Sequence, residues 1–122
     1  MKIFKNKVFA RWAKAQGVPD EALIKAIQEI KRGSYEAQLG GGVYKKRIPL
    51  EGRGKRGGAR TIVAFKLQNK AIFIHGYAKN ERENITLKEQ EALRLLAKIY
   101  FNYTDEQINE TIKAKELIEV LS

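Results

Sequence analysis

The stretch that decides the fold is "VYKKRIPLEGRGKRGGARTIVAFKL", residues 43–67. Residues 43–48 and 60–67 are rich in β-branched and aromatic side chains, a composition typical of strands. The segment between them, "EGRGKRGGAR", has four glycines and predicts the connecting loop. A third apolar run, "KAIFIHGY" at residues 70–77, follows after a tight turn at residues 68–69. Three successive strands with short links predict an antiparallel meander.

Helical patterns lie on both sides of this meander in the sequence. Residues 5–16 carry apolar side chains at helical spacing, and a second helix is predicted from Pro19 to about Gly33. Capping-box patterns at Thr86 and Thr104 begin two further helices. Residues 2–4 and 117–121 are candidates for short additional strands. We therefore expect one α+β domain over residues 1–122, with residues 104–122 as a candidate C-terminal extension. An N-terminal helical hairpin packs on a small antiparallel β-sheet, C-terminal helices follow, and all helices lie on one side of the sheet.

The charge of the chain points to a polyanionic partner. Its 122 residues include 24 Lys and Arg against 14 Asp and Glu, a formal net charge of +10. Eleven of these bases and only three acids fall within residues 36–82. Such a balance favours nucleic acid first, then an anionic membrane or an acidic protein.

Several classes of protein are disfavoured by composition. The chain has no Cys, which excludes disulfides and thiolate-bound zinc, and it has a single His. We therefore expect neither a metal nor another cofactor. The N-terminus shows no secretory signal pattern, and no apolar run is long enough to span a bilayer. The expected location is the cytoplasm, without a membrane partner.

Strand alternation selects the candidate site residues. Lys45 and Arg47 share a face of their strand, which we expect to be exposed, while Lys46 shares the opposite face with Tyr44 and Ile48. Arg60 begins the next strand and Lys79 follows the third. The candidate catalytic residues are Lys45, Arg47, Arg60 and Lys79, and the candidate contacts to nucleic acid are Lys46, Arg53, Lys55, Arg56, Asn80 and Arg82.

A cluster of Lys and Arg can support RNA cleavage. The 2′-hydroxyl of RNA attacks the adjacent phosphate, and the enzyme must orient the strand, move two protons and stabilise added negative charge. Arg donates two parallel hydrogen bonds to a phosphoryl group, and a lysine among other cations has a lowered pKa. Considered from chemistry alone, the same basic loop is more typical of a surface that binds nucleic acid without cutting it. We interpret His75 as a packed or hydrogen-bonded structural residue and the tyrosines as core or rim residues.

The motifs "VYKKRIP", "GRGKRGGARTIVAF" and "GYAKNER", in this order, resemble the RelE/HigB-type toxins of bacterial type II toxin–antitoxin systems, with the HigB-like branch most similar. The resemblance covers residues 39–96 well. It implies a RelE/ParE-like fold related to microbial ribonucleases, and a ribosome-dependent mRNA endoribonuclease (mRNA interferase) that inhibits translation. Lys45 and Arg47 match two usually basic strand positions, Arg60 matches the Arg that contacts the scissile phosphate, and Lys79 matches a Lys of the family.

The resemblance also implies partners and leaves open questions. It implies a cognate antitoxin, expected to be a small helix-turn-helix protein, and operator DNA contacted only through the antitoxin complex. Asn80 stands where the RelE branch has an Arg, and no residue replaces that branch's C-terminal Tyr. Lys45, Arg47 and Lys79 thus remain alternatives for the general acid and base. Two other functions stay open: inhibition of DNA gyrase, as in the sister ParE branch, and non-catalytic RNA or ribosome binding.

Overall fold

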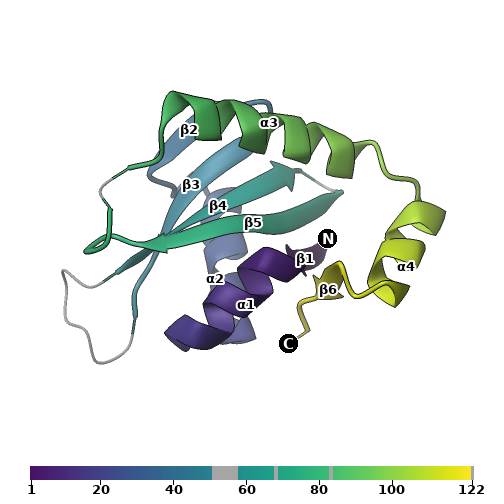
Figure 1. Cartoon of the computed structure of the whole chain (residues 1–122), viewed down its shortest axis with the longest axis horizontal. Coiled ribbons are helices and arrows are strands. Elements are labelled where there is room, and N and C mark those ends of the chain that lie inside the picture. The colour runs from purple at the N-terminus through teal and green to yellow at the C-terminus, as the bar shows by residue number, and fades with distance from the viewer. Residues whose placement is uncertain (51–57, 68, 83, 122) are drawn as a thin grey trace.

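The computed structural model describes residues 1–50, 58–67, 69–82 and 84–121 as a mixed β-sheet with helices on both faces (Figure 1). The strands are β1 (Lys2–Asn6), β2 (Ala37–Gly40), β3 (Val43–Ile48), β4 (Ala59–Lys66), β5 (Lys70–Ala78) and β6 (Leu117–Glu119). The helices are α1 (Lys7–Gln16), α2 (Asp20–Lys31), α3 (Leu87–Phe101) and α4 (Asp105–Lys113). The predicted α+β class is confirmed.

The strands follow the order β2-β3-β4-β5-β1-β6. The predicted meander is confirmed, because β3 pairs antiparallel with β4 and β4 pairs antiparallel with β5. The sheet is not purely antiparallel, since β1 pairs parallel with β5. This pairing places the chain's first strand in the interior of the sheet.

The expectation that all helices lie on one side of the sheet is wrong. Helices α1 and α2 cover one face, called here the α1–α2 face, and α3 and α4 cover the other, called the α3 face (Figure 1). The reason lies in β4, which is apolar on both faces. Val63 and Phe65 pack in the α1–α2 layer, whereas Ile62 and Ala64 pack in the α3 layer. A sheet with two apolar faces needs a cover on each.

The segment "LGGG" is more ordered than its composition indicates. Residues up to Gly40 form the edge strand β2, which pairs with β3. The turn that follows needs glycine at Gly42, where φ is +80° and a Cβ would lie 2.9 Å from Cε2 of Phe101. The turn thereby packs against the end of α3.

The C-terminal residues add to both the sheet and the core. β6 pairs antiparallel with β1, and Val120 N–H donates to the Ile3 carbonyl over 2.8 Å. Ile108 of α4 and Leu117 of β6 are buried in the α3 layer. Within the described part of the chain, no helix combines the length and apolar character needed to cross a bilayer.

Candidate functional site

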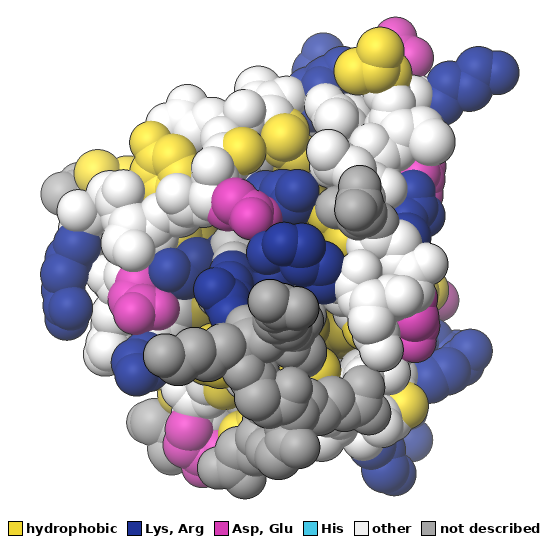
Figure 2. Space-filling model, turned by 90° about the vertical axis from the view of Figure 1, so that its left-hand side faces the viewer, with side chains coloured by type: hydrophobic (Ala, Val, Ile, Leu, Met, Phe, Trp, Pro, Cys, Tyr) yellow, Lys and Arg dark blue, Asp and Glu magenta, His cyan; other side chains and the backbone are white. Residues whose placement is uncertain are grey.

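Cationic side chains of β3 and β4 converge on the α3 face of the sheet. Arg47 pairs with Arg60 in the strand register, and Lys45 pairs with Ile62. Directly paired residues of antiparallel strands point to the same face, with Cβ atoms about 5 Å apart. We call Lys45, Arg47 and Arg60, together with Arg82 from the β5–α3 loop, the basic cluster. Figure 2, in which the left-hand side of Figure 1 faces the viewer, shows Lys and Arg side chains gathered at the centre, with acidic side chains beside them.

Arg60 of the basic cluster is buried. Lys45 is partly buried, contrary to the exposed position expected from the sequence, whereas Arg47 is exposed as expected. The side chains of Arg60 and Lys45 are only 6% and 12% exposed. Glu36, the residue before β2, supplies the counter-charge. Its carboxylate accepts from Arg60 Nε at 2.9 and 3.0 Å, and Lys45 Nζ lies 3.5 Å from Glu36 Oε2. The burial is tolerated because an ionised partner lies against both cations.

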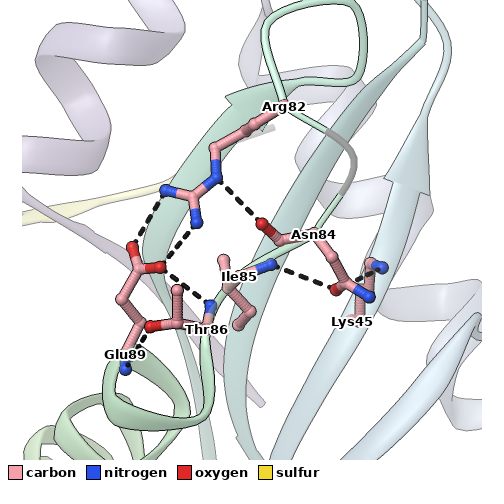
Figure 3. A network of polar contacts seen from close by, with 6 residues as sticks. All are labelled: Lys45, Arg82, Asn84, Ile85, Thr86 and Glu89. Atoms are coloured by element: carbon pink, nitrogen blue, oxygen red, sulfur yellow. Dashed lines mark hydrogen bonds and ion pairs between the residues drawn. The ribbon is translucent and has the colours of Figure 1, made fainter.

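A second network links the basic cluster to the start of α3 (Figure 3). Arg82 Nη1 donates to Glu89 Oε2 at 3.0 Å, and Arg82 Nε donates to the Asn84 carbonyl at 2.9 Å. Lys45 Nζ donates to Asn84 Oδ1 at 3.3 Å. The hydrogen bond from Arg82, aided by the Thr86 N–H, lowers the pKa of Glu89 to about 2. Glu89 of the α3 capping box thereby holds Arg82. Asn84 accepts hydrogen bonds from both Arg82 and Lys45 and so links these two cations.

Three polar atoms on this face have no hydrogen-bond partner among the described residues. They are Arg60 Nη1, the Tyr77 hydroxyl and His75 Nε2. Tyr77 pairs directly with Arg60 across β4 and β5, and its ring lies 5.7 Å from the Arg82 guanidinium carbon. The His75 ring lies 6.0 Å from that of Tyr77, and burial lowers the pKa of His75. An unpartnered buried donor costs free energy, so such a group calls for an explanation.

The remaining candidates from the sequence lie elsewhere. Lys46 points to the α1–α2 face, where its Nζ lies 3.2 Å from Glu29 Oε1 and donates to the Ser34 carbonyl. It is buried and separated from the basic cluster by the sheet, so we leave it out of the site. Lys79 and Asn80 are exposed just beyond the end of β5.

Three further candidates, Arg53, Lys55 and Arg56, lie outside the described residues. The Arg47 side chain lies against Gly58, where a Cβ would be 3.0 Å from Arg47 Nε. The glycine at the end of the loop therefore makes room for a guanidinium of the basic cluster.

Sequence reasoning missed Glu36 and Tyr77 as parts of this site. One signal for Glu36 was present in the sequence, because it is the only acid between residues 30 and 50, and the same region holds the strand with three consecutive bases, Lys45 to Arg47. For Tyr77 the signal was register, since only the pairing of β4 with β5 sets it opposite Arg60. Among the described residues, no group of three His, Asp and Glu side chains is placed to hold a metal ion.

This arrangement suits an anionic ligand. The basic cluster offers guanidinium and ammonium donors, and Nη1 of the buried Arg60 is a donor that no described residue uses. Planar guanidinium groups match the oxygens of phosphate or carboxylate. A family model described as "RelE toxin of RelE / RelB toxin-antitoxin system" matches residues 1–120. A comparison with curated proteins finds no significant match.

Proposed function

Because the chain belongs to the RelE toxin family, we propose that this toxin of a toxin–antitoxin system cuts mRNA on the ribosome. The observation that carries the proposal is the convergence of three cations on one face of the sheet: buried Arg60, partly buried Lys45, and Arg47, which pairs directly with Arg60. Burying a charge costs several kcal/mol on the order-of-magnitude scale of ion desolvation. Burial alone does not indicate a ligand, because Lys46 is buried to a similar extent against Glu29 on the other face. Like charges gathered at one place repel one another, and a ligand with negative charge best explains why they are held together here.

The proposed reaction is transfer within the RNA strand. The 2′-oxygen forms a bond to the adjacent phosphorus, and the bond from phosphorus to the 5′-oxygen of the next nucleotide breaks. A base accepts the 2′-hydroxyl proton, and an acid donates a proton to the leaving 5′-oxygen. The products are a 2′,3′-cyclic phosphate and a free 5′-hydroxyl.

Each cation has a role that its position supports. Arg60 and Arg47, directly paired across β3 and β4, donate to the non-bridging oxygens and stabilise the charge that develops on them. Lys45, Arg47 and Lys79 are the candidates for moving the two protons. Lys79 lies beyond the end of β5 and is exposed, so it can approach the RNA from the solvent side.

The location of the site supports a macromolecular substrate. Figure 2 shows Lys and Arg side chains gathered at the surface of the molecule, and within the basic cluster Arg47 is exposed and Arg82 is partly exposed. Asn80 and the loop bases Arg53, Lys55 and Arg56 extend the proposed contact to RNA or ribosome. The cognate antitoxin, for which we propose a small helix-turn-helix protein, neutralises the toxin and carries any contact to operator DNA.

The test is induction of the protein in growing cells, followed by mapping of mRNA 5′ ends. We expect new 5′ ends within translated regions and arrested growth. Arg60→Gln is expected to abolish both, whereas Lys46→Gln, which alters a buried lysine on the opposite face, retains them in proportion to the folded protein present. Arrested growth with intact transcripts and inhibited gyrase would instead favour a ParE-like function. Binding to RNA without new 5′ ends would favour a non-catalytic module.

A further inference from the structure

The Tyr77 hydroxyl is the most deeply buried polar group of the site that lacks a partner in the described part of the chain. Tyr77 is 4% exposed, and its hydroxyl makes no hydrogen bond to any residue that the structure describes. A buried hydroxyl ordinarily makes a hydrogen bond, since burying it without one costs on the order of 1–3 kcal/mol. Tyr100 on α3, which is 9% exposed, is the contrasting case: its hydroxyl is not among the unpartnered buried atoms of the described residues, and an interaction with Asn6 acts on its pKa. The Tyr77 hydroxyl therefore calls for a ligand.

A second unpartnered donor lies beside it, on the neighbouring strand and the same face of the sheet. Tyr77 and Arg60 are paired residues of β5 and β4, and Arg60 Nη1 also has no partner among the described residues. Glu36 occupies only the Nε of that guanidinium. A hydroxyl and a guanidinium N–H can both donate, so one group that accepts two hydrogen bonds satisfies them together. The surrounding cations of the basic cluster favour a group that also carries negative charge.

We propose that Tyr77 is a phosphate-binding residue, and that its hydroxyl and Arg60 Nη1 hold the non-bridging oxygens of one phosphodiester of the RNA. This inference rests on the proposed function and adds a residue to its site. The phosphate enters from the side of Arg82, whose guanidinium carbon lies 5.7 Å from the Tyr77 ring. Arg82 is about one third exposed on a loop, so its side chain yields to a ligand at less cost than the sheet beneath it.

Two properties separate this role from a structural one. A hydroxyl that only supports the fold stabilises the free protein, so its removal lowers stability. A hydroxyl that makes its hydrogen bond only to a ligand does not stabilise the free protein, so its removal leaves the free protein as stable or more stable. Tyr77→Phe should therefore keep or raise the thermal midpoint while it weakens binding of phosphate.

The experiment compares the parent protein with Tyr77→Phe and with Tyr100→Phe as the matched control. Thermal unfolding is measured with and without inorganic phosphate, and binding of a 2′-O-methylated RNA, which cannot be cut, is measured by fluorescence anisotropy. We expect Tyr77→Phe to unfold no earlier than the parent, to lose most of the phosphate-dependent shift, and to bind the RNA about tenfold to a hundredfold more weakly, the effect of one hydrogen bond to a charged group. Tyr100→Phe should unfold earlier and keep both responses.

A lower midpoint for Tyr77→Phe without phosphate, or an unchanged response to phosphate and RNA, would overturn the inference. The outcome is distinct from that of the proposed function. A parent protein that cuts no mRNA on the ribosome refutes the proposed function, whereas the phosphate response of Tyr77→Phe still decides whether this residue binds phosphate.

Discussion

Glu36 offers the sharpest test of how the basic cluster is held, through the substitution Glu36→Gln. The change keeps the shape of the side chain and removes the charge that lies 2.9 Å from Arg60 Nε. Breaking a fully buried ion pair costs about 3–5 kcal/mol, and an exposed pair contributes at most about 1 kcal/mol. Here Arg60 is buried but the Glu36 side chain is 37% exposed, so water screens one partner. We expect the free energy of unfolding to fall by about 2 kcal/mol, between these limits.

The opposite face of the sheet supplies a matched control. Glu29 pairs with the buried Lys46 at 3.2 Å, and the exposed fractions of this pair, 36% and 8%, are close to those of Glu36 and Arg60. Glu29→Gln should therefore cost a similar free energy of unfolding. Only Glu36→Gln, however, frees a cation of the basic cluster for a ligand.

The assay is urea unfolding of both variants and the parent, with and without inorganic phosphate. We expect phosphate to stabilise Glu36→Gln more than the parent, because the ligand replaces the lost carboxylate, and to act on Glu29→Gln as on the parent. The reasoning fails if Glu36→Gln unfolds like the parent, since Arg60 would then not depend on this carboxylate. It also fails if both variants gain equally from phosphate.

Three further predictions concern the surroundings of the site. Burial lowers the pKa of His75 below its usual 6.5, so the unfolded chain binds a proton at a higher pH than the folded chain. The free energy of unfolding should therefore decrease as the pH falls below 6.5. His75→Phe should make the thermal midpoint less dependent on pH between pH 7.5 and 5.5. The pKa of Glu89 is about 2 instead of 4.5, so the stabilisation by its hydrogen bond with Arg82 is present above pH 4.5 and is lost as the pH falls toward 2. In an acid titration followed by circular dichroism, Glu89→Gln should remove the loss of stability that occurs between these two pH values. A Cβ at Gly76 would lie 2.4 Å from Cε3 of Trp12, so Gly76→Ala should cost about 1–3 kcal/mol in urea unfolding, and an unchanged midpoint would contradict this packing.

The parts of the fold that local pattern determines were predictable from the sequence. Strands β3, β4 and β5 are short-range neighbours, and alternation along β3 correctly put Lys45 and Arg47 on one face and Lys46 on the other. The parallel pairing of β1 with β5 was not predictable, because it joins Ile3 to Ala71 across most of the chain.

Burial within the site was also beyond the sequence pattern. The sequence pattern does not indicate the burial of Arg60, because that burial depends on Glu36, 24 residues earlier, and on α3, which covers this face. The same dependence explains why Tyr77 read as a core or rim residue. Its proposed role depends on Arg60, which lies beside it only because of the register between β4 and β5.

The central claim is that cations on the α3 face of the sheet carry RNA cleavage, and one measurement tests it most directly. A translating mRNA in a purified translation system is incubated with the parent, with Arg60→Lys or with Lys46→Gln, each at equal folded concentration, and its cleavage rate is followed by primer extension. Arg60→Lys retains the positive charge but lacks the guanidinium fork. We predict a rate at least about tenfold lower for Arg60→Lys, from the loss of one charged hydrogen bond, and the parental rate for Lys46→Gln. Equal rates for the parent and Arg60→Lys, or a loss of cleavage confined to Lys46→Gln, would contradict the claim.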